Sequence, residues 1–227
     1  MDTTDTTQFM PILNNPLTDE QRDLLAKNTR MGYPYKGEVL FFPGDQPLYL
    51  HYLMEGIVTI YTQTDDGTER TANMLAPNAI FGYRNAFTNT PYTYKAVAGS
   101  NTVIAKIPME VIFHLIWENS GFAMVFIKDL SDLLGTSLRH TIYISQKNIR
   151  GRLAECILHM KEKYGTEADG TLPVYLSREN LAGMSNMTTS NAIRTLSAFM
   201  DEGLVSLAGR RIKILDEEGL QRVSAIG

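Results

Sequence analysis

The sequence predicts an α+β protein with an N-terminal antiparallel β-roll or jelly roll, one long helix, and a C-terminal winged helix-turn-helix domain. Two observations carry this prediction. Between Gly37 and Pro108, turn residues separate short runs of β-branched and aromatic residues, as in a closed all-β domain. From Met109 to Lys163 prolines are absent and apolar residues recur every three or four positions, which is typical of helices.

The first expected element is a helix that starts after Thr18. Thr18 can act as its N-cap, and Gln21 stands three residues later, which is the spacing of a capping box. The strands of the β-roll are expected in the runs EVLFF, LYLHYLMEG, IVTIYTQ, ERTANML and TVIAKI. Asp66-Gly67 lies between two of these runs and predicts a tight hairpin, because both central residues of a type I′ turn need positive φ.

A long helix is expected over residues 121–146. Its apolar stripe consists of residues three or four apart: Phe126, Leu130, Leu133 or Leu134, and Leu138. The stripe can pack against the β domain or form the seam of a two-helix dimer, and the sequence leaves both readings open. A second helix is expected from Ile149 to Lys163, with residues 164–171 as a loop, and one face of it carries Leu153, Ile157 and Met160.

The segment from Leu176 to Val205 predicts a helix-turn-helix. Ser177 can cap a short first helix, and Asn186 can adopt the left-handed backbone that a tight turn needs. Thr188 can cap the second helix, which ends before a glycine at position 203. At 100° per residue, the second helix separates an apolar face from a polar one: Ala192, Leu196 and Phe199 against Ser190, Arg194 and Ser197.

The polar face of the second helix is a candidate for contact with double-stranded DNA. Arg194 can pair with O6 and N7 of a guanine, and Thr189 or Ser190 can bond a base or a phosphate. The next runs predict a hairpin wing around Ala208-Gly209-Arg210-Arg211, whose cations suit phosphate contact. A solvated helix face is the alternative reading. The candidate DNA-contact residues are Thr188, Thr189, Ser190, Arg194, Ser197, Arg178, Arg210 and Arg211.

Composition limits the remaining choices. With 227 residues of which 44% are apolar, the chain can bury a core, and its net charge of −4 does not point to nucleic acid. The acidity belongs to residues 1–146, because residues 147–227 hold 11 Lys and Arg against 10 Asp and Glu. No apolar run approaches the roughly 18 residues of a membrane span, and the start MDTTDTTQF lacks a secretion signal, which predicts a cytoplasmic protein without a membrane partner.

The single cysteine, Cys156, excludes three kinds of site within one chain. These are an internal disulfide, a four-thiolate zinc site, and an iron–sulfur cluster held by cysteines. A cupin-like metal enzyme is also disfavoured, because no His-x-His pair with a nearby carboxylate accompanies the β-roll. The sequence therefore predicts neither a metal site nor an enzyme.

The order of these elements resembles the Crp/Fnr family of bacterial transcription regulators over nearly the whole chain. The matching pieces are G-E-x-L-F-x-P-G-D at residues 37–45, the hairpin DDGTER, Phe81-Gly82, the run GRLA at 151–154, and the helix-turn-helix. The resemblance implies a cyclic nucleotide-binding-like sensor domain over residues 1–120, a dimerisation helix over 121–146, and a winged DNA-binding domain over 147–227. It also implies a homodimer, a pseudo-palindromic operator, an unidentified small-molecule effector, and contact with RNA polymerase if the protein is an activator.

The sequence departs from the family's cyclic-nucleotide branch, which uses a G-E-L motif and an Arg-Ser/Thr pair. Tyrosine stands here where the glutamate would be, and Thr93-Tyr94, which has no arginine, stands where the Arg-Ser/Thr pair would be, so cyclic AMP is not expected as the ligand. The candidate effector pocket consists of Phe81, Gly82, Tyr83, Arg84, Thr93 and Tyr94. Haem stays open as a cofactor, because four single histidines could each supply an axial ligand: His51, His114, His140 and His159.

The DNA-reading residues depart from the family as well. The usual Glu-x-x-x-Arg of the recognition helix is Ser190 and Arg194 in this chain, which predicts an altered or relaxed half-site. A competing function also stays open: a β-roll sensor whose winged domain mediates protein–protein interaction without sequence-specific DNA binding. The weak net charge of residues 147–227 favours that alternative.

Overall fold

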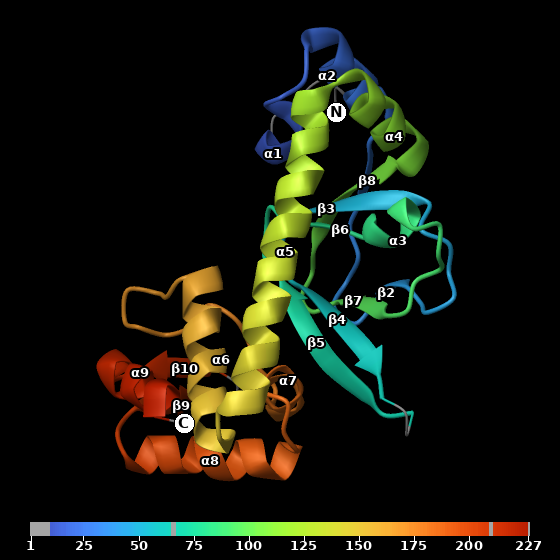
Figure 1. Cartoon of the computed structure of the whole chain (residues 1–227). Coiled ribbons are helices and arrows are strands. Elements are labelled where there is room, and N and C mark those ends of the chain that lie inside the picture. Colours follow the sequence, from blue (N-terminus) through green and yellow to red (C-terminus); the bar gives the residue numbers. More distant parts are fainter. Residues whose placement is uncertain (1–9, 65–66, 209–210, 227) are drawn as a thin grey trace. The chain divides into compact units, whose positions relative to one another are not determined.

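The computed structural model describes residues 10–64, 67–208 and 211–226, which belong to two compact units (Figure 1). The N-terminal unit is formed by residues 1–63 and 73–134, and the C-terminal unit by residues 64–72 and 135–227. The strand β5 (Glu69–Leu75) and the helix α5 (Ser120–Gln146) each contribute residues to both units.

Two four-stranded sheets form the β-roll of the N-terminal unit, which confirms the predicted fold class. One sheet has the order β1-β8-β3-β6, with β1 (Arg30–Gly32), β8 (Val103–Pro108), β3 (Tyr49–Glu55) and β6 (Ile80–Phe81). The other has the order β2-β7-β4-β5, with β2 (Val39–Phe41), β7 (Lys95–Ala98) and β4 (Val58–Gln63). Neighbouring strands pair antiparallel, as β3 does with both β8 and β6.

The five strands expected from the sequence are present, and β1, β6 and β7 are additional. Of the expected Asp66-Gly67 turn, only Gly67 lies within the described residues, where it has a φ of +81°. The helix after Thr18 is α2 (Asp19–Asn28), and it begins with the predicted capping box. The Gln21 amide donates to Thr18 Oγ1 at 3.3 Å, and the Thr18 amide donates to Gln21 Oε1 at 3.2 Å.

Strand β3 lies between two hydrophobic clusters, which explains why four consecutive residues of it are buried. Alternation along the strand places Leu50 and Tyr52 on one face and His51 and Leu53 on the other. Leu53 packs in the cluster between the two sheets with Phe41, Val58, Leu75, Phe81, Tyr92, Ala96 and Ile104.

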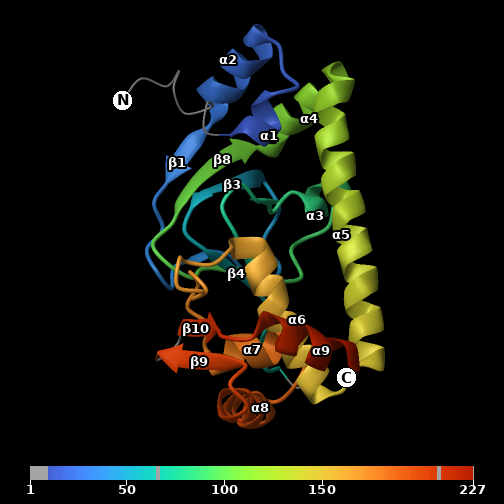
Figure 2. The same ribbon diagram turned by 90° about the vertical axis from the view of Figure 1, so that its left-hand side faces the viewer.

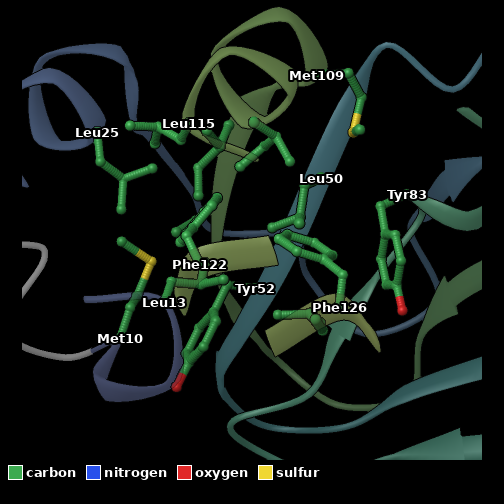
Figure 3. Packing of buried hydrophobic residues seen from close by; sticks show 14 of the residues in the cluster. Met10, Leu13, Leu25, Leu50, Tyr52, Tyr83, Met109, Leu115, Phe122 and Phe126 are labelled. Atoms are coloured by element: carbon green, nitrogen blue, oxygen red, sulfur yellow. The ribbon is translucent and has the colours of Figure 1, made fainter. Parts of the chain in front are cut away.

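The second cluster lies between β3 and the helices α1 (Pro11–Asn14), α2, α4 (Met109–Glu118) and α5. Figure 3 shows Leu50 and Tyr52 of β3 among side chains of these helices, including Leu13, Leu25, Leu115, Phe122 and Phe126. The helices thereby cover one face of the sheet that contains β3.

The long helix α5 has the bounds that the sequence predicts within one residue. Phe126 of its predicted stripe is buried in the N-terminal unit and Leu133 is half-buried, whereas the rest of the stripe is exposed: Leu130, Leu134 and Leu138. Among the described helices, none is by itself long and apolar enough to cross a membrane. The helix α4 and residues 120–143 of α5 reach that length and composition only as a pair, with an angle of 115° between them.

In the C-terminal unit, α6 (Ile149–Tyr164) packs against three other helices: α7 (Arg178–Met184), α8 (Thr189–Asp201) and α9 (Glu217–Ile226). The predicted inward residues of α6 and α8 are all buried: Leu153, Ile157, Met160, Ala192, Leu196 and Phe199. The strands β9 (Val205–Ala208) and β10 (Arg211–Ile214) form the wing hairpin, shown in red in Figure 2. The helix α9 was not predicted.

Candidate functional site

The helices α7 and α8 form the predicted helix-turn-helix. Ser177 Oγ accepts a hydrogen bond from the Asn180 amide at 3.0 Å, and Thr188 Oγ1 accepts one from the Asn191 amide at 3.3 Å. In the turn between the helices, Asn186 has a φ of +48°, and the buried Met187 donates its amide to Ala182 O at 2.9 Å. Local hydrogen bonds thus determine where both helices begin.

The outer face of α8 presents the predicted polar residues. Ser190, Arg194 and Ser197 are exposed, as is Thr188 before the helix, whereas Thr189 is half-buried. Ser190, Arg194 and Ser197 lie on the side of α8 opposite its buried face. The structure therefore brings three of the predicted DNA-contact residues to one helix face, and Thr188 and Thr189 lie at the N-terminus of the same helix.

Asn191 is a candidate contact residue that the sequence reasoning missed. Arg194 Nη2 donates a hydrogen bond to Asn191 Oδ1 at 3.0 Å, so the amide holds the guanidinium against the helix one turn closer to its N-terminus. An asparagine can pair with N6 and N7 of an adenine, as an arginine can with a guanine. The spacing of three between Asn191 and Arg194 was the signal that could have revealed this pair.

Two cations of the wing pair with acidic side chains, which the sequence does not reveal. Gly209 and Arg210 lie outside the described residues. The Arg211 guanidinium donates to the Glu167 carboxylate, and Lys213 Nζ lies 3.6 Å from Asp169 Oδ2. These two wing cations therefore have intramolecular acidic partners. Arg178 begins α7 and is half-buried.

The interior of the β-roll next to the candidate effector residues is filled by aromatic side chains. Phe41 stacks on Tyr92 with ring centroids 3.9 Å apart, and His51 stacks on Phe81 at 5.0 Å. The Tyr92 hydroxyl donates to Gly82 O at 2.7 Å. An effector bound between the two sheets would have to displace some of these rings, because protein interiors are close-packed.

Gly82 is required at its position for two reasons. It has a φ of +79°, which side-chain-bearing residues rarely adopt, and a Cβ atom on it would lie 2.7 Å from His51 Nδ1. Of the other predicted pocket residues, Phe81 and Tyr83 are buried, Arg84 and Tyr94 are half-buried, and Thr93 is exposed. The structure thus does not bring Thr93 into the interior with the others.

Tyr83 connects the segment after β6 to the long helix within the N-terminal unit. Its hydroxyl donates to the Asp129 carboxylate of α5. Its ring lies edge-on to that of Phe126, with the ring centroids 5.2 Å apart, and Figure 3 shows both side chains. Burial, reinforced by the bond to Asp129, raises the pKa of Tyr83. The neighbouring Arg84 has a buried Nε atom without a hydrogen-bond partner among the described residues.

The three histidines with described side chains do not favour haem. His51 is buried and stacked on Phe81, and burial lowers its pKa to about 3. A porphyrin bound to it would have to displace the stacked rings. His114 Nε2 lies 3.4 Å from Glu118, and His159 Nδ1 lies 3.7 Å from Glu162. The His140 side chain is outside the described part, which contains no group of three potential metal ligands.

A β-roll followed by a long helix and a winged helix-turn-helix defines the class of two-domain transcription regulators. Residues 35–119 match the family model of the cyclic nucleotide-binding domain, and residues 151–223 match that of the Crp-like helix-turn-helix domain. The chain belongs to the Crp/Fnr family of transcription regulators. Regulators of this family bind DNA and act as dimers.

Two curated relatives and one solved structure illustrate the similarity. The chain is 24% identical to the global nitrogen regulator of Nostoc sp. over 183 residues, which cover 79% of this chain and 82% of the relative. It is 22% identical to the CRP-like cAMP-activated global transcriptional regulator of Mycobacterium tuberculosis, over 82% and 84% of the two chains. The structure of FixK2 from Bradyrhizobium japonicum shares the fold with a TM-score of 0.77 at 17% identity, over 86% of this chain and 96% of that one.

Proposed function

We propose that this regulator binds a specific, pseudo-palindromic DNA site as a homodimer, with α8 in the major groove. The exposed face of α8, where Asn191 orients Arg194, is the observation that carries the proposal. Thr188, Thr189, Ser190, Arg194 and Ser197 face the bases or nearby phosphates, and Arg178, Arg210 and Arg211 contact phosphates. Residues 1–120 act as the sensor, residues 121–146 as the dimerisation helix, and residues 147–227 as the DNA-binding domain.

Arg194→Ala tests the assignment of the recognition helix. We expect the variant to lose about 1–3 kcal/mol of binding free energy on the best site and to lose its preference at one guanine, because a bidentate pair is removed. The site is first selected from a random duplex library with the wild-type protein, and fluorescence anisotropy then measures both proteins on it. Arg222→Ala, which removes an exposed arginine of α9, is the matched control. Unchanged discrimination in the Arg194 variant would show that another residue reads the guanine.

The apolar stripe of α5 supports the homodimer. Five apolar residues three or four positions apart are between 37% and 62% exposed in the single chain: Ile127, Leu130, Leu134, Leu138 and Ile142. A continuous exposed stripe on a helix of 27 residues is suited to pairing with the same stripe of a second copy. We propose that this pairing, rather than packing on the β domain, is the main role of the stripe beyond Phe126.

Leu134→Glu is expected to convert the dimer into monomers. A glutamate in the middle of the seam would bury an unpaired charge next to its symmetry mate, which costs several kcal/mol. Thr136→Glu introduces the same charge at an exposed position off the stripe and is expected to leave the dimer intact. Sedimentation equilibrium of both variants gives the masses. A dimeric Leu134→Glu protein would place the dimer interface elsewhere.

The signal is proposed to act through the β-roll, where Tyr83 connects the candidate effector residues to α5. A ligand can shift the regulator between two arrangements only if it binds them with different affinity. The absence of cyclic AMP control, the contact with RNA polymerase and the cytoplasmic location stay predictions. The alternative function, protein–protein interaction through the winged domain, would be favoured if no DNA sequence were enriched from the library, with or without small-molecule cell extract.

A further inference from the structure

A loop of the C-terminal unit holds two acidic side chains against the cations of the wing. Glu167 pairs with Arg211, and Asp169 lies 3.6 Å from Lys213. The wing is the part of the domain to which the proposed function assigns phosphate contacts, so the acids occupy the partners that DNA would use. All four side chains are between 32% and 56% exposed, which leaves the pairs open to exchange with an external anion.

Backbone hydrogen bonds hold this loop beside the wing. The Leu172 amide donates to Ile212 O at 2.8 Å and the Ile214 amide to Gly170 O at 3.1 Å, so residues 170–172 run along β10 as an additional edge. Thr171 forms a β-bridge with Lys213 within this edge. The place of the acids next to the wing therefore follows from the backbone, not from the side chains alone.

The acidic side chains are also oriented from within the loop. The Asp169 carboxylate accepts hydrogen bonds from the Thr171 amide at 3.0 Å and from Thr171 Oγ1 at 2.9 Å. These bonds, together with the nearby Lys213, lower the pKa of Asp169, so the carboxylate is ionised at neutral pH. On the other pair, the Arg211 guanidinium lies 5.9 Å from the centre of the Tyr175 ring and against Glu167.

We propose that Glu167 and Asp169 form an electrostatic gate that competes with DNA phosphates for Arg211 and Lys213. This inference rests on the proposed DNA-binding function and adds a determinant of its selectivity. Contacts with phosphates supply nearly all of the affinity for non-specific DNA, whereas base contacts distinguish the specific site. Occupying the wing cations with internal acids therefore weakens binding to random DNA while the contacts of α8 are retained.

The double variant Glu167→Gln/Asp169→Asn tests the gate. We expect it to bind a random duplex roughly 2- to 20-fold more tightly than the wild type, which is the effect of freeing two surface ion pairs. The slope of log K against log salt is expected to become steeper by up to about 0.9 for each freed cation. Anisotropy titrations from 50 to 300 mM KCl, on a random and a selected duplex, measure both quantities.

The control is Glu162→Gln/Glu218→Gln, which removes the same charge from the same unit. Among the described residues, these acids pair with His159 and Arg222 and not with the wing cations. We expect the control to change the affinity and the salt slope much less than the gate variant does. Thermal unfolding of all variants verifies that they are folded, and surface pairs of this kind are expected to affect it little.

Removal of the acids would also tighten binding if they acted only by repelling DNA directly. Variants at Arg211 distinguish the two mechanisms. If Glu167 acts by occupying Arg211, Glu167→Gln raises the affinity of the wild type but has no such effect in an Arg211→Gln background. Equal gains in both backgrounds, or a gate variant equal to the control, would contradict the gate. A wild-type protein that selects no DNA sequence would instead contradict the proposed function itself.

Discussion

Between pH 6.5 and pH 3 the N-terminal unit is expected to lose about 4 kcal/mol of unfolding free energy through one side chain, His51. Burial between the sheets, with a smaller effect of the Lys106 charge, lowers the pKa of His51 from 6.5 to about 3. In this pH window the unfolded chain binds a proton at the imidazole and the folded chain does not. Acid therefore favours unfolding, and the stabilisation by neutral His51 is complete only above pH 6.5.

Urea titrations followed by circular dichroism at pH 7, 6, 5 and 4 measure this loss. Because carboxylates also titrate below pH 5, the effect of His51 is the difference between the wild type and His51→Phe, which keeps an aromatic ring next to Phe81 but binds no proton. The variant is expected to have a flatter dependence of stability on pH. His114→Gln, at an exposed position on α4, is the control that should keep the wild-type dependence. The same slope in the wild type and in His51→Phe would mean that the buried imidazole does not govern the response.

Phe199→Ala is expected to lower the unfolding free energy of the C-terminal unit by about 3–5 kcal/mol. Phe199 is completely buried on the inner face of α8, with the Arg150 guanidinium 5.1 Å from the centre of its ring. Its carbonyl oxygen accepts the Leu204 amide at 2.9 Å, where α8 ends and the wing begins. The cavity left by the alanine would thus lie at the junction of α8 and the wing, so we expect DNA affinity to fall together with stability.

Met200→Ala is the matched control, because Met200 is the next residue of α8 but is exposed, and its replacement is expected to cost less than about 1 kcal/mol. Phe199→Leu keeps most of the volume and preserves a folded protein for DNA binding if the alanine variant is too unstable. Urea titrations compare the three variants. If Phe199→Ala lowers the unfolding free energy no more than Met200→Ala does, the Phe199 ring does not anchor α8 in the core of the unit.

The parts of the fold that the sequence predicted depend on residues close together along the chain. The hydrogen bonds of Thr18, Ser177 and Thr188 each reach three residues onward, and Asn186 turns the chain by its own φ angle. Periodicity likewise predicted the buried face of α8. The strands β1, β6 and β7, of two to four residues each, lay outside the longer β-branched and aromatic runs that predicted the other strands, such as EVLFF around β2.

The sequence-based interpretation of the wing was incomplete for a different reason. Charge counting treats the wing cations as free, but in the fold Arg211 and Lys213 lie next to acids that precede them by more than forty residues. The candidate effector pocket shows the same limit. Its residues were proposed by family resemblance, and only the folded structure shows that Phe41, His51 and Tyr92 fill the space beside Gly82.

By itself, the sequence determined the order of the β-roll, the long helix and the winged domain, and the helix-turn-helix with its exposed face, because capping, turn conformation and helical periodicity act over a few residues. The tertiary structure decided which charged side chains pair and which side chains fill the interior of the β-roll. Tyr83 and Asp129 are 46 residues apart, and Arg211 and Glu167 are 44 apart, so no local pattern links them. Such contacts depend on the path of the whole chain, since two groups interact only when the intervening elements have packed and brought them together.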